Sequence, residues 1–267
     1  MTGLPLSAEL AARARDVLAG RVRPAPARDA ATVVLLRPGP EVYLLRRKAT
    51  MAFAAGAYVF PGGSVDARDA DQDVAWAGPS PAEWGEVFNA GERLARGLVC
   101  AAVRETFEES GVLLAGPGPD SVVADTTGDD WEADRLALID RSLGLSDFLA
   151  RRGLVLRSDL LKPWAHWITP EIESKRFDTR FFVAVLPEGQ RTRDVGGEAD
   201  RVIWQRPGEA LELAREGEIF LMPPTHHTLG ELTAYDRVAD VLAARREIVT
   251  IMPRAVEIEG ELRLVTS

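Results

Sequence analysis

The hydrophobic and polar positions of the chain follow two repeats, one typical of strands and one typical of helices. Short runs rich in branched and aromatic residues are bounded by turn residues, which indicates strands. These runs are residues 31–47, with a turn at 38–40, and residues 57–63, 161–170, 177–187 and 200–205. Longer segments with apolar positions three or four apart predict helices at residues 7–19, 81–110, 130–152, 207–218 and 230–245. Because the two kinds of segment are interleaved, we predict an α/β or α+β fold, and we expect a single domain over residues 1–267.

The segment 81–110 carries both the start and the stop signals of a helix. Ser80 and Glu83 have the spacing of a capping box, and Pro81 stands at the first helical position. Gly111 stands where a helix commonly ends in a left-handed residue.

The residues before this helix, 64–80, are polar and irregular, and residues 115–129 form a second loop rich in glycine, proline and aspartate. A cluster of aspartates in the first loop is interpreted as a solvated insertion, because the glycine and glutamate of a calcium loop are missing. The cluster consists of Asp66, Asp69, Asp71 and Asp73.

Composition narrows the classes of function. The chain is 46% hydrophobic and 27% charged, and its formal net charge of −9 argues against nucleic-acid binding, which favours a basic stripe. No apolar run reaches the ~18 residues of a membrane-spanning helix, and residues 1–20 lack the apolar core of a secretion signal. The single cysteine, Cys100, excludes an intrachain disulfide and fits a reducing compartment. We therefore expect a cytoplasmic protein that binds neither nucleic acid nor membrane.

Three glutamates crowd onto one side of the predicted helix. A helix turns about 100° per residue, so Glu105, Glu108 and Glu109 share one arc, whereas an apolar stripe of Val99, Val103, Phe107 and the neighbouring Cys100 faces away. Like charges at this spacing repel each other. The arc is therefore either a solvated acidic face or a cluster of oxygen ligands suited to Mg²⁺ or Mn²⁺.

The residues around these glutamates resemble a known motif. The sequence RETFEESGV, residues 104–112, is similar to the second half of the Nudix box, and VFPGG, residues 59–63, is similar to the element that opens the box. In this chain residues 64–103 separate the two halves, far more than in the usual box. The resemblance implies the Nudix α/β/α sandwich with a mixed sheet, an insertion at about 64–90 and a helical elaboration at about 115–155.

Two positions depart from the usual box. Thr106 replaces an aliphatic residue, and Arg96 stands eight positions before Arg104, where the box has a glutamate that supports its arginine. The partner of Arg104 is therefore unknown. A box interrupted by a long insertion resembles the boxes of the peroxisomal-type branch of coenzyme A and acyl-CoA diphosphatases. Segments similar to those of that branch are residues 46–63, 167–187 and 220–229. The coenzyme A signature of that branch has an arginine near the position of Phe53.

The resemblance implies a metal-dependent hydrolase that cleaves a diphosphate linked to a nucleoside. Glu105, Glu108 and Glu109, with the backbone carbonyl of Gly63, are the expected ligands of Mg²⁺ or Mn²⁺. Arg104 is expected to orient a carboxylate, and Gly62 to let the chain pass close to the helix and the substrate.

The catalytic base is left open by the sequence. Glu198 precedes a predicted strand, as a distant catalytic glutamate of the family often does, and a solvated loop acid is an equal alternative. Arg46 and Arg47, at a strand end, are candidate contacts of the substrate. His226 and His227 adjoin a Pro-Pro turn and are interpreted as structural.

Three hypotheses follow. The first is a diphosphatase of coenzyme A or acyl-CoA, and the second is a Nudix diphosphatase of ADP-ribose or a dinucleotide. The third is a non-catalytic Nudix module that binds a nucleotide or a partner. For the enzyme we expect a small-molecule diphosphate as the substrate and a possible homodimer as the assembly.

Overall fold

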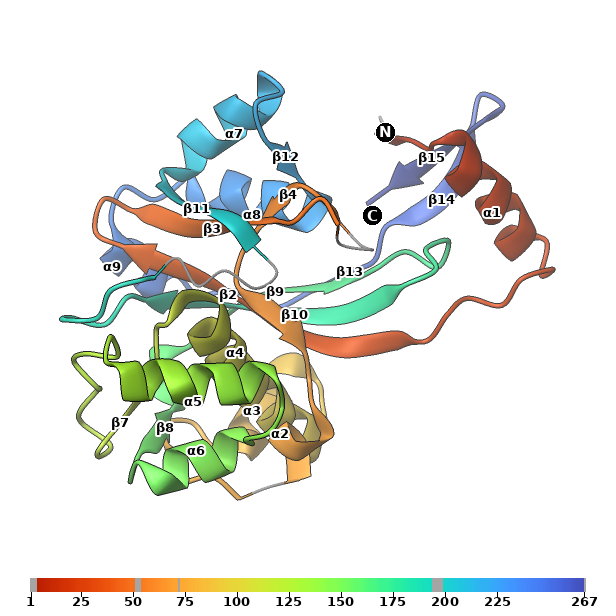
Figure 1. Ribbon diagram of the computed structural model, residues 1–267. Coiled ribbons are helices and arrows are strands. Elements are labelled where there is room, and N and C mark those ends of the chain that lie inside the picture. The colour runs from red at the N-terminus through yellow and green to blue at the C-terminus, as the bar shows by residue number, and fades with distance from the viewer. Residues whose placement is uncertain (1–3, 51–53, 72, 194–198, 267) are drawn as a thin grey trace.

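The computed structural model describes residues 4–50, 54–71, 73–193 and 199–266. Within these ranges a mixed sheet lies between two groups of helices, as Figure 1 shows, which confirms the predicted α/β/α arrangement. The main sheet has the order β12-β4-β3-β2-β10-β9-β13, with β11 paired to β3 and β5 paired to β2. Its strands are β2 (Ala27–Arg37), β3 (Glu41–Arg47), β4 (Ala57–Val59), β5 (Gly62–Ser64), β9 (Lys162–Ile168), β10 (Arg176–Val185), β11 (Ala199–Gln205), β12 (Phe220–Leu221) and β13 (Thr250–Ile251).

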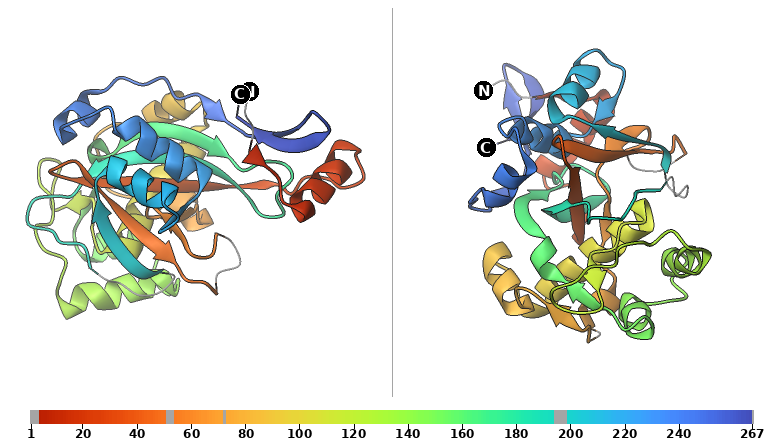
Figure 2. Two further views of the ribbon diagram at one scale, coloured as in Figure 1. Left: turned by 90° about the horizontal axis from the view of Figure 1, so that it is seen from above. Right: turned by 90° about the vertical axis from the view of Figure 1, so that its left-hand side faces the viewer.

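Helices cover both faces of this sheet. The α-helices are α1 (Ala8–Leu18), α2 (Ala67–Asp71), α3 (Pro81–Phe88), α4 (Glu92–Ser110), α5 (Asp129–Ile139), α6 (Leu145–Arg151), α7 (Pro207–Arg215), α8 (Pro223–Leu232) and α9 (Val238–Ala243). Helices α2 to α6 lie on one side of the sheet and α7 to α9 on the other (Figures 1 and 2). No helix in the described ranges is both long and apolar enough to cross a membrane.

Two small sheets complete the fold. In one, β15 (Glu261–Val265) lies between β1 (Leu4–Pro5) and β14 (Arg254–Ile258). In the other, β8 (Val155–Arg157) lies between β6 (Trp76–Ala77) and β7 (Ala115–Gly116).

The alternation of side chains along β2 divides the apolar interior into two cores. Val33 and Leu35 pack into a core with α3 and α4, whereas Val34 and Leu36 pack into a core with α7, α8 and α9. Side chains alternate between the faces of a strand, so an uninterrupted apolar run is expected where both faces are covered. The central strands are therefore buried on both sides.

Helix α4 begins and ends where glycines permit it. Gly91 is its N-cap, and Gly111 ends it with a φ of 75°, its N–H donating to the carbonyl of Phe107 at 2.9 Å. The predicted C-cap is confirmed. The capping box of Ser80 and Glu83 is also present, but it starts the separate helix α3 rather than one long helix.

Three other sequence predictions need correction. The single strand predicted at residues 57–63 is two strands, β4 and β5. The second strand, β5, begins at Gly62 and contains Gly63. Residues 64–80 include the helix α2. The Pro-Pro pair starts helix α8, so the helix predicted at 230–245 is replaced by α8 and α9. A proline at the first helical position has no N–H to leave unpaired, and this signal was available in the sequence.

Candidate active site

Strand β5 passes directly against the glutamate side of α4. The Gly62 N–H donates to Oε2 of Glu109 at 2.8 Å. A Cβ atom at Gly63 would lie 2.3 Å from Oε1 of Glu105, a distance that real Cβ atoms do not tolerate. The two glycines therefore permit the backbone to approach the carboxylates.

Arg104 is the centre of a buried ion network. Its Nη1 donates to Oε1 of Glu105 at 2.8 Å and to Oε1 of Glu108 at 3.1 Å, and its Nη2 donates to the Ser64 carbonyl at 3.0 Å. Its Nη2 also donates to Oδ2 of Asp69 at 2.9 Å. The side chain of Asp69 is 2% exposed and that of Arg104 is 11% exposed. Asp69 is thus the partner of Arg104 that the sequence left unknown.

This position of Asp69 corrects the interpretation of the aspartate cluster as solvated. Asp69 lies on α2, which packs against α4 at Gly97. A Cβ atom at Gly97 would lie 2.8 Å from Cγ1 of Val65 and 3.2 Å from Cβ of Ala70. Glycine inside a helix costs about 1 kcal/mol relative to alanine, and here it allows α2 to bring Asp69 to Arg104.

Burial changes the charge state of the carboxylates. Burial raises the pKa of Glu105 to about 7, against the lowering effect of Arg104. Burial also raises the pKa of Glu108, again opposed by Arg104. For Arg104 itself burial alone would lower the pKa, but Glu105, Asp69 and Glu108 raise it above its ordinary value. The three carboxylates around Arg104 therefore have a larger total negative charge, when ionised, than this one arginine can neutralise.

The helical elaboration at residues 115–155 contributes two arginines that lie near Glu108. The buried Arg135 of α5 donates from Nη1 to the backbone carbonyl of Glu108 at 2.7 Å and pairs with Glu132. Arg141 follows α5 in a left-handed conformation, with a φ of 64°, and lowers the pKa of Glu108. Sequence reasoning missed both arginines, because nothing local distinguishes them from surface arginines.

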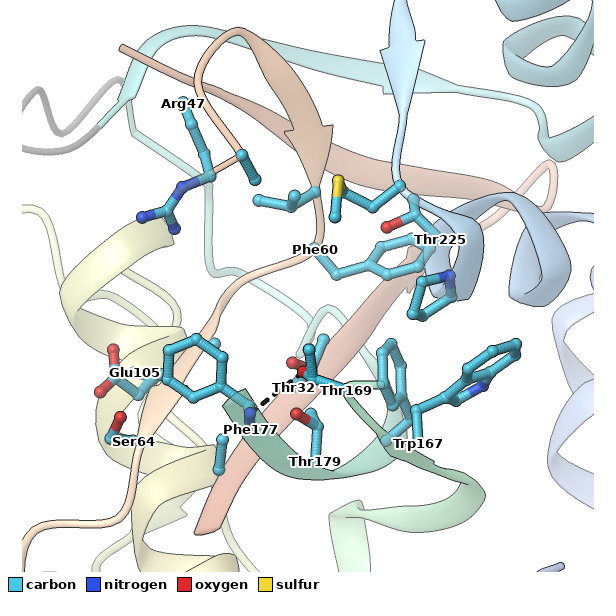
Figure 3. Close-up of a pocket in the computed structure, with 18 of the residues that line it drawn as sticks. Thr32, Arg47, Phe60, Ser64, Glu105, Trp167, Thr169, Phe177, Thr179 and Thr225 are labelled. Carbon is cyan, nitrogen blue, oxygen red and sulfur yellow. Dashed lines mark hydrogen bonds between the residues drawn. The ribbon is translucent and has the colours of Figure 1, made fainter. Parts of the chain in front are cut away.

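A cavity of about 1230 Å³ connects these carboxylates to an apolar region. One end, here called the carboxylate end, is lined by Gly62, Gly63, Ser64, Glu105, Glu108 and Glu109. The other end, here called the apolar arm, is lined by Phe60, Trp167, Phe181, Phe220, Leu221 and Met222. Figure 3 shows Glu105 and Ser64 on one side of the cavity and Phe60 and Trp167 on the other, with Thr32 and Thr179 between them.

The structure separates the two arginines at the end of β3. Arg47 lines the cavity and extends over the side where Glu105 lies (Figure 3). Arg46 instead donates from Nε to Oδ1 of Asp200 at 2.6 Å and is not among the residues that line the cavity. Neighbouring residues of a strand face opposite ways, so only Arg47 remains a candidate contact of the substrate.

The remaining candidates lie in different places. Glu198 lies outside the described residues. His226 and His227 line the cavity from α8, and the ring of His227 packs edge-on against Trp167. Cys100 is fully buried, as its place beside the apolar stripe predicts, and burial raises the pKa of its thiol to about 12.

The donor set of the carboxylate end fits a hard divalent cation. It consists of carboxylate and carbonyl oxygens, the ligands that Mg²⁺ and Mn²⁺ prefer. In the described ranges no three acidic, histidine or cysteine side chains are already gathered as a metal site. Arg104 holds Glu105 and Glu108, while the Gly62 amide holds Glu109. The candidate ligand oxygens are therefore present and partly oriented, but in this structure they do not point toward one common position for a cation.

The interrupted box, the mixed sheet and the glutamate helix together define a Nudix-type protein. Residues 91–232 match the NUDT19 Nudix domain, and the chain belongs to this family. A crystal structure of a NUDIX hydrolase from Alicyclobacillus acidocaldarius is similar, with a TM-score of 0.69 and 29% identity over 83% of this chain and 98% of that chain.

Two animal proteins named acyl-coenzyme A diphosphatase NUDT19 are similar in sequence. The human protein is 28% identical over 282 residues, which cover 84% of this chain and 74% of the human one. The Xenopus laevis protein is 28% identical over 235 residues, which cover 72% of this chain. The chain spans 59% of the length of the frog protein.

Proposed function

We propose that the chain is a metal-dependent Nudix diphosphatase that hydrolyses the diphosphate of acyl-CoA. The observation that carries the proposal is one continuous cavity in which an acidic, oxygen-rich end continues into an apolar arm. A substrate that joins a diphosphate to an acyl chain matches both ends at once. The names of the human and frog relatives support the same substrate class.

The glycines and glutamates of the carboxylate end each receive a role in this proposal. Glu105, Glu108, Glu109 and the Gly63 carbonyl would hold Mg²⁺ or Mn²⁺. A bound cation of this kind neutralises the diphosphate and lowers the pKa of a coordinated water. Arg104 positions Glu105 and Glu108 through hydrogen bonds from its Nη1, and the Gly62 amide positions Glu109. The catalytic base remains open, with Glu198 as one candidate.

The bond changes are those of hydrolysis. A water oxygen forms a bond to one phosphorus of the diphosphate, and the bond from that phosphorus to the bridging oxygen breaks. The water proton passes to the catalytic base, and the bridging oxygen leaves with the other phosphate. The products of acyl-CoA are then adenosine 3′,5′-bisphosphate and an acyl phosphopantetheine. Arg47, which lines the cavity over the side where Glu105 lies, would contact the charge of the diphosphate.

Substrate profiling tests the proposal. Product release is measured for coenzyme A, acetyl-CoA, a long-chain acyl-CoA, ADP-ribose and NADH, each with Mg²⁺ or Mn²⁺. We expect the acyl-CoA substrates to have the highest kcat/KM. Preferential cleavage of ADP-ribose or NADH would keep the carboxylate end and reject the substrate. Absence of turnover with every substrate and both ions would favour a binding module over an enzyme.

A further inference from the structure

Two cationic side chains, Arg28 and Lys175, line the cavity outside its carboxylate end. Arg28 on β2 lies opposite Phe177 on the neighbouring parallel strand β10. Lys175, just before β10, holds its Nζ 5.4 Å from the centre of the Phe177 ring. Both cations line the cavity, and both side chains are exposed. Phe177 is thus the neighbour that Arg28 and Lys175 share.

Three other cations that line the cavity are instead held in ion pairs. Arg68 pairs with Asp66, Arg104 with the acidic network, and Arg135 with Glu132. In the part of the chain that the structure describes, no ion pair joins Arg28 or Lys175 to a carboxylate. The acid nearby on the cavity wall is Glu173, and the cation that acts on it is Arg13 of α1. Arg28 and Lys175 are therefore available to an anionic group of the ligand.

The strand register gives the separation between Arg28 and the proposed reaction centre. Ala31 of β2 pairs with Gly63, so Arg28 lies three residues along the strand from the residue whose carbonyl is the proposed metal ligand. At 3.3 Å per residue this is about 10 Å. A ribose that carries phosphates at its 5′ and 3′ positions bridges a gap of this order. Figure 3 shows Phe177 on the same side of the cavity as Glu105 and Ser64, whereas the apolar arm leads away from them.

We propose that Arg28 and Lys175 form a subsite for the 3′-phosphate on the nucleotide half of the substrate, while the acyl half occupies the apolar arm. The proposal rests on the proposed function, because coenzyme A derivatives carry a 3′-phosphate that ADP-ribose and NADH lack. A phosphomonoester has a charge of about −1.5 to −2 at neutral pH. Two exposed cations give it a contact of modest strength that salt weakens. Arg28 and Lys175 thus determine specificity and take no part in the bond changes.

The test compares acetyl-CoA with its 3′-dephospho analogue in four proteins: the wild type, Arg28→Ala, Lys175→Ala and the double variant. Arg201→Ala, an exposed arginine of β11 that does not line the cavity, is the matched control. We expect the wild type to prefer acetyl-CoA by about tenfold in kcat/KM at low salt. The double variant should lose this preference because its rate with acetyl-CoA falls, while its rate with the analogue stays unchanged. The Arg201→Ala variant should keep the preference.

Two results would overturn the subsite: no preference in the wild type, or an equal loss with both substrates in the double variant. Calorimetric binding of adenosine 3′,5′-bisphosphate and of AMP provides a readout without turnover. If neither acyl-CoA substrate is cleaved, the proposed function fails, but the subsite still predicts weaker binding of the bisphosphate to the double variant and equal binding of AMP. Unchanged binding of the bisphosphate would reject the subsite on its own.

Discussion

The carboxylate end and the apolar arm of the cavity are built by opposite means. At the carboxylate end, charged side chains are buried and fixed by one another, as in the Asp69–Arg104–Glu105 network. Within the described ranges the residues that define the apolar arm form no such network; they come from β9, β10 and β12 and from the residues that follow β4 and precede α8. The ion-paired end is suited to chemistry and the apolar end to binding. Substitutions at the carboxylate end should therefore lower kcat, and substitutions in the apolar arm should raise KM.

The largest effect is expected from removal of the divalent cation. Without it, the diphosphate charge is not neutralised and no water is activated, so turnover of acetyl-CoA should fall by about 10³-fold or more. The measurement is product release after dialysis against a chelator, followed by addition of Mg²⁺ or Mn²⁺. Full activity in the chelated protein would show that the carboxylates serve another purpose.

The next effect is expected at Asp69. The Asp69→Asn variant leaves Arg104 without its buried carboxylate, and loss of one partner of a buried pair costs about 3–5 kcal/mol. We expect kcat to fall by about 10- to 100-fold, with KM nearly unchanged and Mn²⁺ bound more weakly. Asp71→Asn is the matched control, because Asp71 lies on the same helix but pairs with Arg93 at the exposed surface.

A second substitution sharpens this result. Arg96→Glu returns a glutamate to the position eight residues before Arg104, where the usual box has one. In the Asp69→Asn background it should recover part of the lost kcat, measured with acetyl-CoA at saturating Mn²⁺. Equal activity of Asp69→Asn and Asp71→Asn would mean that Asp69 does not support the site.

A smaller effect is expected in the apolar arm. Phe220 lines the cavity and is 56% exposed, so Phe220→Ser should leave folding intact. Loss of apolar contact with a long acyl chain should raise KM by about fivefold for a long-chain acyl-CoA and change kcat little. Steady-state kinetics with coenzyme A provides the comparison, since that substrate has no acyl chain. An equal change for both substrates would place the acyl group elsewhere.

The smallest effect concerns pH and the stability of the metal-free protein. The pKa of Glu105 is raised from its ordinary 4.5 to about 7 in the folded state. Between these values the folded protein binds more protons than the unfolded chain, so stability falls as pH rises through this window. From pH 5 to pH 8 the wild type should lose of order 1 kcal/mol relative to Glu105→Gln.

Urea denaturation at each pH measures this difference. Added Mn²⁺ should remove it, because the cation stabilises the ionised carboxylate. A difference that does not depend on pH would mean that Glu105 is ionised throughout the range.

Local patterns in the sequence predicted much of the fold. The strands β2 and β3, the apolar side of α4 and the end of α4 at Gly111 depend on periodicity and caps, which neighbouring residues determine. The family resemblance located the glutamates and the two glycines of β5. These residues lie together in the structure, although their roles in catalysis remain a prediction.

Long-range packing explains what the sequence did not predict. Asp69 becomes buried only because α2 docks on α4 at Gly97, and an aspartate in a polar loop carries no sign of this docking. Arg135 reaches the Glu108 carbonyl for a similar reason, through the placement of α5. The alternation of a strand, in contrast, already implied that Arg46 and Arg47 could not both face the cavity.

The most direct test of the central claim follows metal binding and turnover together in the wild type and in Glu109→Gln. Mn²⁺ is titrated into both proteins while bound metal is measured by electron paramagnetic resonance and adenosine 3′,5′-bisphosphate release from acetyl-CoA is measured in the same samples. The account predicts that the two signals rise together in the wild type and that both collapse in Glu109→Gln. Undiminished turnover in Glu109→Gln, or turnover in the wild type that does not follow bound metal, would contradict it.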